Sequence, residues 1–95
     1  MSTVVFGDGF EWDDAKALAN VAKHGVSFEE AAEALEDPRS SDVGDVAHAE
    51  RVVTLAMCAR TGVLYIVSCE RGARVRIISA RRATRHEQRS YEARE

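Results

Sequence analysis

Three runs rich in β-branched residues in the second half of the chain constrain the fold more than any other feature. They are Val52–Ala59, Val63–Cys69 and Ala73–Ala80. The intervals between them are only Arg60-Thr61-Gly62 and Glu70-Arg71-Gly72, a length and composition typical of hairpin connections. The sequence therefore predicts three strands that form an antiparallel meander.

Two helices are predicted before this meander. The first runs from about Asp14 to His24, with Asp13 as its N-cap and Gly25 at its end. Its apolar face is expected to consist of Ala15, Leu18, Ala19 and Ala22, with Lys16, Asn20 and Lys23 facing elsewhere. We expect this apolar face to cover one side of the sheet.

The second helix begins at Ser27, which forms a capping box with Glu30, and ends at Asp37-Pro38. Another capping box, Thr84 with Glu87, predicts a C-terminal helix. Residues 9–12 are interpreted either as a short strand or as an aromatic anchor. The 95 residues fit one domain, residues 1–95, with an α+β fold: two N-terminal helices on a small antiparallel sheet, namely the three-stranded meander plus short N-terminal strands.

Two-residue turns at Thr61-Gly62 and Arg71-Gly72 would set the two faces of the meander. The core face, covered by the helices, is then Val53, Leu55, Met57, Leu64, Ile66, Val75 and Ile77. The open face is Thr54, Ala56, Cys58, Tyr65, Val67, Cys69, Arg74, Arg76, Ile78 and Arg82. Arginines interleaved with an aromatic ring are typical of an RNA-binding surface. A slip of one residue would exchange the two faces.

Charge is distributed unevenly along the chain. Residues 1–50 contain three basic and twelve acidic residues, whereas residues 71–95 contain eight arginines, no lysine and three glutamates. Such a split indicates a polyanion-binding end or a surface for a complementary protein partner, although a basic run is most often a solvated face. Arginine without lysine favours phosphate, because a guanidinium can bind two phosphate oxygens at once.

Several protein classes are excluded at this stage. The chain has no run of about 18 apolar residues and no secretory signal, so we expect a cytoplasmic protein that does not contact a membrane. Its two cysteines and three histidines lack metal-ligand spacing, so neither a metal site nor a cofactor is expected.

A series of short segments in a fixed order points to a known family. They are Phe10-Glu11-Trp12-Asp13, Lys16, Asn20, Lys23-His24-Gly25-Val26-Ser27-Phe28-Glu29-Glu30-Ala31, Asp37-Pro38, Glu70-Arg71-Gly72, Val75-Arg76-Ile77-Ile78-Ser79-Ala80-Arg81-Arg82-Ala83-Thr84, Glu87 and Tyr91. Together they resemble the BrnT family, the toxins of a bacterial type II toxin–antitoxin system, over about residues 10–92.

This resemblance implies a RelE-like fold and a metal-independent endoribonuclease that stops translation. It also implies neutralisation by a ribbon-helix-helix antitoxin (BrnA-like). The complex is expected to be a heterotetramer of two toxins joined through an antitoxin dimer. It would repress its own operon and would contact operator DNA only through the antitoxin.

Metal-free RNA cleavage needs groups that transfer protons and groups that stabilise charge on the phosphate. Lys23, His24, His86 and Tyr91 are the candidates for proton transfer. The predicted catalytic residues are Lys23, His24, Arg76 and Arg81. The predicted RNA-binding residues are Tyr65, Arg71, Arg74, Arg82 and Arg85.

Each of these assignments has a structural alternative. In the structural alternative, His24, which precedes the helix-ending Gly25, only caps the carbonyls at the end of the first helix. In the structural alternative for Arg76, it forms a salt bridge with a carboxylate on a neighbouring strand. Glu70, however, is the only acidic residue in the two outer-face strands and their turn. There are two alternatives for the whole chain. One is a non-catalytic module that binds a protein or RNA through its C-terminal arginines, and the other is a decayed toxin kept as an accessory repressor subunit.

Overall fold

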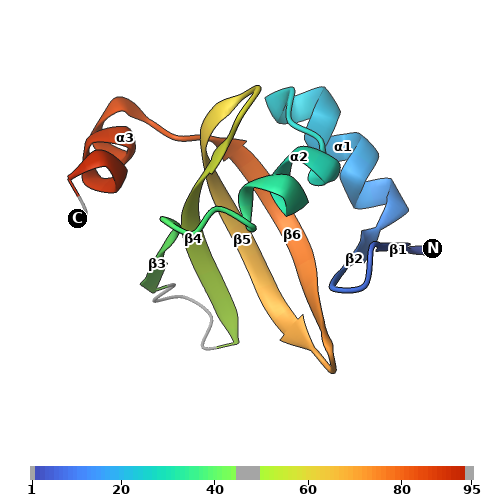
Figure 1. Cartoon of the computed structure of the whole chain (residues 1–95). Coiled ribbons are helices and arrows are strands. Elements are labelled where there is room, and N and C mark those ends of the chain that lie inside the picture. The colour runs from blue at the N-terminus through green and yellow to red at the C-terminus, as the bar shows by residue number, and fades with distance from the viewer. Residues whose placement is uncertain (1, 45–49, 94–95) are drawn as a thin grey trace.

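A single mixed sheet organises the part of the chain that the structure describes, residues 2–44 and 50–93 of this computed structural model (Figure 1). Within these residues, the strands are β1 (Thr3–Phe6), β2 (Phe10–Asp13), β3 (Ser41–Gly44), β4 (Arg51–Cys58), β5 (Gly62–Arg71) and β6 (Arg74–Arg82). The helices are α1 (Asp14–His24), α2 (Phe28–Ala34) and α3 (Arg85–Glu92). The strand order across the sheet is β1-β2-β6-β5-β4-β3.

The predicted meander is present as β4, β5 and β6, but the prediction of a small antiparallel sheet is wrong. β2 joins β6 in parallel, with Phe10 opposite Val75 and Glu11 opposite Arg76. β1 extends the sheet beyond β2, and β3 extends it beyond β4. β1, β2 and β3 have four residues each, which is too short for a clear period-two pattern, and the parallel pairing joins segments far apart in the chain.

The predicted faces are right for β5 but wrong for β4. The first hairpin closes with Cys58 opposite Gly62, so its loop is Ala59–Thr61 rather than a two-residue turn. This register places Ala56 opposite Leu64, on the side that the helices cover. The corrected helix-covered residues of β4 are Thr54, Ala56 and Cys58, and the corrected open-face residues are Val53, Leu55 and Met57.

A β-bulge changes the faces a second time, within β6. Ile77 pairs with Ser68 and Ser79 pairs with Val67, so Ile78 is the extra residue between them. One inserted residue reverses the alternation beyond it. Arg81 therefore lies on the open face opposite Tyr65, and the prediction that Arg82 lies there is wrong.

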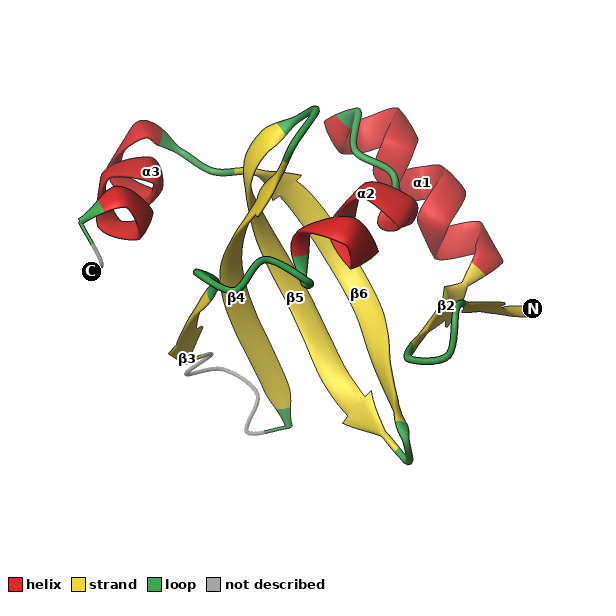
Figure 2. Ribbon diagram, viewed as in Figure 1, coloured by secondary structure: helices red, strands yellow, loops and turns green. Residues whose placement is uncertain are grey.

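Helices α1 and α2 cover the same side of the sheet, as Figures 1 and 2 show. The core beneath them contains Trp12, Phe28, Leu64, Ile66 and Ile77, all at most 2% exposed. The Ser27–Glu30 capping box of α2 is confirmed.

The predicted orientation of α1 is wrong. Leu18 is 68% exposed, whereas Asn20, which was expected to face away from the core, is 7% exposed. The Asn20 side-chain amide donates to the carbonyls of Val26 and Ala80 and accepts from the Ala80 N–H. These hydrogen bonds turn the polar side chain inward, so the alanine and leucine stripe faces solvent.

Helix α3 packs at the other side of the molecule, near β4 (Figure 1). Its Thr84–Glu87 capping box is confirmed. Tyr91 is buried in a second apolar cluster on the open face, with Leu55, Val63 and Ala83. Its hydroxyl donates a hydrogen bond to Asp37, so α3 is attached both to the sheet and to the segment after α2. Among the described residues, no helix is long and apolar enough to cross a membrane.

Candidate nucleic-acid interface

The open face carries a row of basic and aromatic side chains that we call the arginine face. It consists of Tyr65 from β5 and Arg74, Arg76 and Arg81 from β6. Side chains alternate along each strand, and the neighbours Leu64, Ile77 and Ala80 point into the core on the other side. The sheet therefore presents these four side chains away from α1 and α2.

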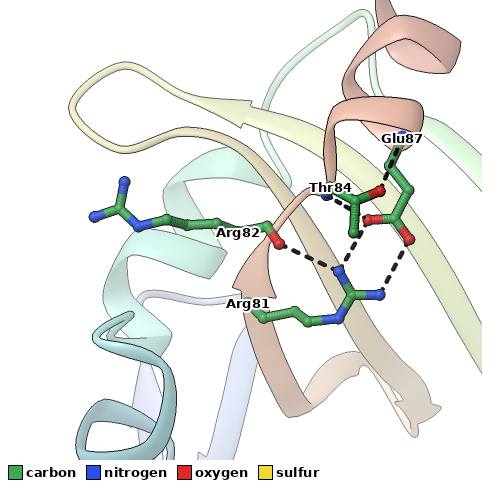
Figure 3. A network of polar contacts seen from close by, with 4 residues as sticks. All are labelled: Arg81, Arg82, Thr84 and Glu87. Carbon is green, nitrogen blue, oxygen red and sulfur yellow. Dashed lines mark hydrogen bonds and ion pairs between the residues drawn. The ribbon is translucent and has the colours of Figure 1, made fainter.

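Arg81 is held in one orientation by two side chains, those of Tyr65 and Glu87. Figure 3 shows its contacts with Glu87 and with the Arg82 carbonyl. Its guanidinium lies 3.8 Å above the centre of the Tyr65 ring. Its two terminal nitrogens donate to the two carboxylate oxygens of Glu87, at 2.9 and 3.0 Å. The Arg81 side chain is still 35% exposed.

Arg81 and Glu87 each stabilise the charged form of the other. Donating to the Glu87 carboxylate raises the pKa of Arg81, and accepting these hydrogen bonds lowers the pKa of Glu87. Glu87 also closes the capping box of α3 with Thr84, as Figure 3 shows. A guanidinium held over an aromatic ring and oriented by a carboxylate is a positively charged group with a fixed position on the open face.

Arg76 makes a contact that the sequence interpretation missed. Its Nη1 lies 2.6 Å from Oε2 of Glu11, whose side chain is only 8% exposed. Arg74 lies 3.8 Å from the other Glu11 oxygen. The argument that Glu70 was the only acidic partner available is therefore wrong, because β2 lies beside β6 and brings in Glu11. Arg76 neutralises this buried carboxylate.

The remaining predicted residues lie elsewhere, except Arg71, which pairs with Arg74 and shares the open face. Lys23 and His24 form the last turn of α1, on the helix-covered side. Arg82 points away from Arg81 (Figure 3) and donates to the Thr61 carbonyl at 3.3 Å. Arg71 is at the β5–β6 hairpin, and Arg85 is the first residue of α3. The structure thus groups Tyr65 with Arg81 and Arg74 with Arg76, and places Lys23, His24 and Arg82 on the opposite side.

The two other candidates for proton transfer have different surroundings. Burial and the hydrogen bond to Asp37 raise the pKa of Tyr91, whose hydroxyl is engaged as a donor. His86 is exposed on α3. Within residues 2–44 and 50–93, no group of three or more His, Cys, Asp or Glu side chains is placed to hold a metal ion.

Glu11 and Glu87 are the residues of this surface that sequence reasoning missed. Glu87 carried a signal, because it closes a predicted capping box six residues after Arg81. That position brings its carboxylate back over the end of β6. Glu11 carried no comparable signal, because only the parallel pairing of β2 with β6 makes it a neighbour of Arg76.

Comparisons with known proteins agree with this architecture. A family model described as the ribonuclease toxin BrnT of type II toxin–antitoxin systems matches residues 12–87. The fold is similar to the crystal structure of the Brucella abortus ribonuclease toxin BrnT, with a TM-score of 0.63 and 22% sequence identity over 78% of this chain and 94% of that chain. No curated protein matches the chain. Because the family model covers most of the sequence, the chain belongs to the BrnT family of type II ribonuclease toxins.

Proposed function

We propose that this chain is a toxin with a RelE-like architecture that cleaves RNA without a metal ion and thereby inhibits translation. The observation that carries the proposal is the Arg81 guanidinium, stacked on Tyr65 and oriented by Glu87. Single-stranded RNA presents phosphates that pair with such a group and unstacked bases that stack on aromatic rings. Arg74 and Arg76 continue the positive charge along β6.

Metal-free cleavage requires removal of a proton from the 2′-OH, stabilisation of the charged phosphorane and protonation of the 5′-oxygen. We assign binding of a neighbouring RNA phosphate to Arg81. We assign charge stabilisation at the cleaved phosphate to Arg82, which lies on the same side of the sheet as α1. We assign proton transfer to His24 or Lys23, which follow Asn20 by about one helical turn. Asn20 is bonded to Ala80, and Arg82 is two residues further along β6. An RNA strand crossing the end of β6 would then meet Arg81 on one side and Arg82 on the other.

The proposed partner is a ribbon-helix-helix, BrnA-like antitoxin. The family's membership of type II systems supports a protein antitoxin. We propose that two toxins bind one antitoxin dimer in the cytoplasm. This heterotetramer would repress its operon by contacting operator DNA through the antitoxin alone.

Cleavage of labelled single-stranded RNA in EDTA tests the catalytic proposal. The wild type should cleave RNA but not 2′-O-methyl RNA, which lacks the attacking hydroxyl. Arg81→Lys keeps the positive charge but loses the bidentate hydrogen bonding of the guanidinium, so the cleavage rate should fall by about 10- to 100-fold. Arg89→Lys on the exposed side of α3 is the matched control and should cleave like the wild type.

The role of His24 needs a separate comparison. If His24 transfers a proton, His24→Gln should lower kcat and change its pH profile while the melting temperature stays the same. If His24 only caps α1, the melting temperature should fall and the pH profile should keep its shape.

A non-catalytic binding module is the second candidate. The pairing of Arg76 with Glu11 and of Arg81 with Glu87 favours it, because both arginines already have carboxylate partners. This candidate would replace the first if the purified chain bound RNA without cleaving it and if translation continued when the chain was expressed alone.

A further inference from the structure

A groove with an apolar floor and acidic walls runs along the helix-covered side of the sheet, below α2. It consists of two adjoining cavities of 290 and 560 Å³ that share Phe10 and Val75. Figure 2 shows that α1 and α2 cover only part of this side and leave uncovered the ends of β5 and β6 nearest their hairpin. Half-buried apolar side chains line it: Phe10, Leu35, Val52 and Val75.

The walls of this groove carry one sign of charge. Among the described residues that line it, five are carboxylates and none is basic. The carboxylates are Asp8, Glu33, Glu36, Asp42 and Glu70. All five residues are exposed. The groove therefore repels RNA phosphates, and it lies on the opposite side of the sheet from the arginine face.

We propose that this groove binds a basic, amphipathic segment of a protein partner. The segment's apolar side chains would cover Phe10, Leu35 and Val75, and its lysines or arginines would meet the acidic walls. This arrangement satisfies the two features that distinguish the groove, because it removes apolar surface from water and places opposite charges together. If the proposed function holds, the partner is the antitoxin, and it can bind while the arginine face stays open.

A peptide titration of the isotope-labelled full chain tests this inference by NMR. The probe is a short synthetic peptide with lysine and leucine at helical spacing. We expect the amide signals of Phe10, Leu35 and Val75 to move while those of Tyr65 and Arg81 stay in place. The Glu36→Gln/Glu70→Gln double variant should bind about tenfold more weakly, because two of the facing charges are removed.

Two controls decide what the binding depends on. Glu29→Gln removes one carboxylate charge from α2 outside the groove and should bind the peptide like the wild type. A peptide with serine in place of leucine should bind weakly, because it cannot fill the apolar floor. Equal loss with Glu29→Gln, equal binding of the serine peptide, or signals that move on the arginine face would each overturn the proposal.

This test does not depend on RNA cleavage. Peptide binding without any ribonuclease activity would leave the groove as a docking site and remove the proposed function. RNA cleavage without peptide binding would support the proposed function and overturn the groove as a docking site. The folded state of the double variant is checked in the same spectra, because the amide signals of residues remote from the groove should keep their wild-type positions.

Discussion

Asn20 attaches α1 to the sheet, and the position of this helix depends on its side-chain amide. The amide nitrogen donates to the carbonyls of Val26 at 2.9 Å and Ala80 at 2.8 Å, and the amide oxygen accepts from the Ala80 N–H at 3.1 Å. Asn20→Ala would leave these backbone groups buried without partners. We expect the free energy of unfolding to fall by about 2–4 kcal/mol, measured by urea denaturation.

The matched control for this substitution is Leu18→Ala on the same helix. Because Leu18 is 68% exposed, the change should alter the free energy of unfolding by less than about 0.5 kcal/mol. A loss for Leu18→Ala as large as that for Asn20→Ala would mean that α1 packs through its alanine and leucine face instead.

Asp37 is expected to make stability depend on pH. It accepts hydrogen bonds from the Tyr91 hydroxyl and from the N–H groups of Arg39 and Met57. Burial raises the pKa of Asp37, but these hydrogen bonds and the charge of Arg39 outweigh it and hold the pKa below the ordinary value of 3.8. The ionised carboxylate therefore stabilises the folded state above pH 3.8, and this contribution is lost as the pH falls through the lowered pKa.

The measurement is the difference in unfolding free energy between the wild type and Asp37→Asn across a pH series. The difference should be largest near neutral pH and should shrink as the pH falls below 3.8. Tyr91→Phe removes one of the three hydrogen bonds and should keep part of the pH dependence. A difference that stays constant through the acid range would assign the stabilisation to a group other than the Asp37 carboxylate.

At the scale of elements, α3 is the part of the fold most dependent on its caps. It has eight residues, and within it only Tyr91 is buried. Isolated helices of this length are unstable in water, so α3 relies on Tyr91 and on the Thr84–Glu87 capping box. Thr84→Ala removes the hydroxyl that accepts from the Glu87 N–H, which should cost about 1 kcal/mol.

Hydrogen exchange of the backbone amides measures this loss locally. In Thr84→Ala, the amides of α3 should exchange several-fold faster while those of β4, β5 and β6 keep their wild-type protection. Ser90→Ala, at an exposed position within α3, is the control and should leave exchange unchanged. Faster exchange throughout the sheet would mean that α3 unfolds only together with the core.

The elements differ in how far the sequence predicts them, and the reason is the range of the interactions involved. The capping boxes at Ser27 and Thr84 are local patterns, and both were predicted correctly. The face of β4 was predicted wrongly. The hairpin loop is one residue longer than assumed, and this moves every side chain of β4 to the other side of the sheet. The bulge at Ile78 moved Arg81 to the open face for the same reason.

In the candidate site, the contacts that the sequence did not predict join segments that are distant in the chain. Tyr65 was placed on the open face correctly, since its neighbours in β5 alternate clearly. The partners that orient the arginines were missed, because Glu87 reaches Arg81 through the turn after β6 and Glu11 reaches Arg76 through a parallel strand. Neither contact follows from periodicity, which describes one element at a time.

At the scale of the whole molecule, the sheet separates two surfaces of opposite charge. The arginine face lies on one side, and the groove walled by Asp8, Glu33, Glu36, Asp42 and Glu70 lies on the other. Charges screened by salt act over about 8 Å at physiological ionic strength. The chain's net charge of −3 therefore says little about RNA binding, because the local field of each side governs what approaches it.

This separation predicts a specific salt dependence for RNA binding. Affinity for a fluorescent 2′-O-methyl RNA, which cannot be cleaved through its 2′-OH, is measured by anisotropy over a range of salt concentrations. If Arg81 contacts a phosphate, Arg81→Gln should reduce the slope of log affinity against log salt by about 0.7, the value for one contact to a single strand. Glu36→Gln, which changes charge only on the groove side, should leave the slope unchanged. A slope that responds to Glu36→Gln and not to Arg81→Gln would place the RNA on the helix-covered side, because counterions are released only where phosphates meet the protein.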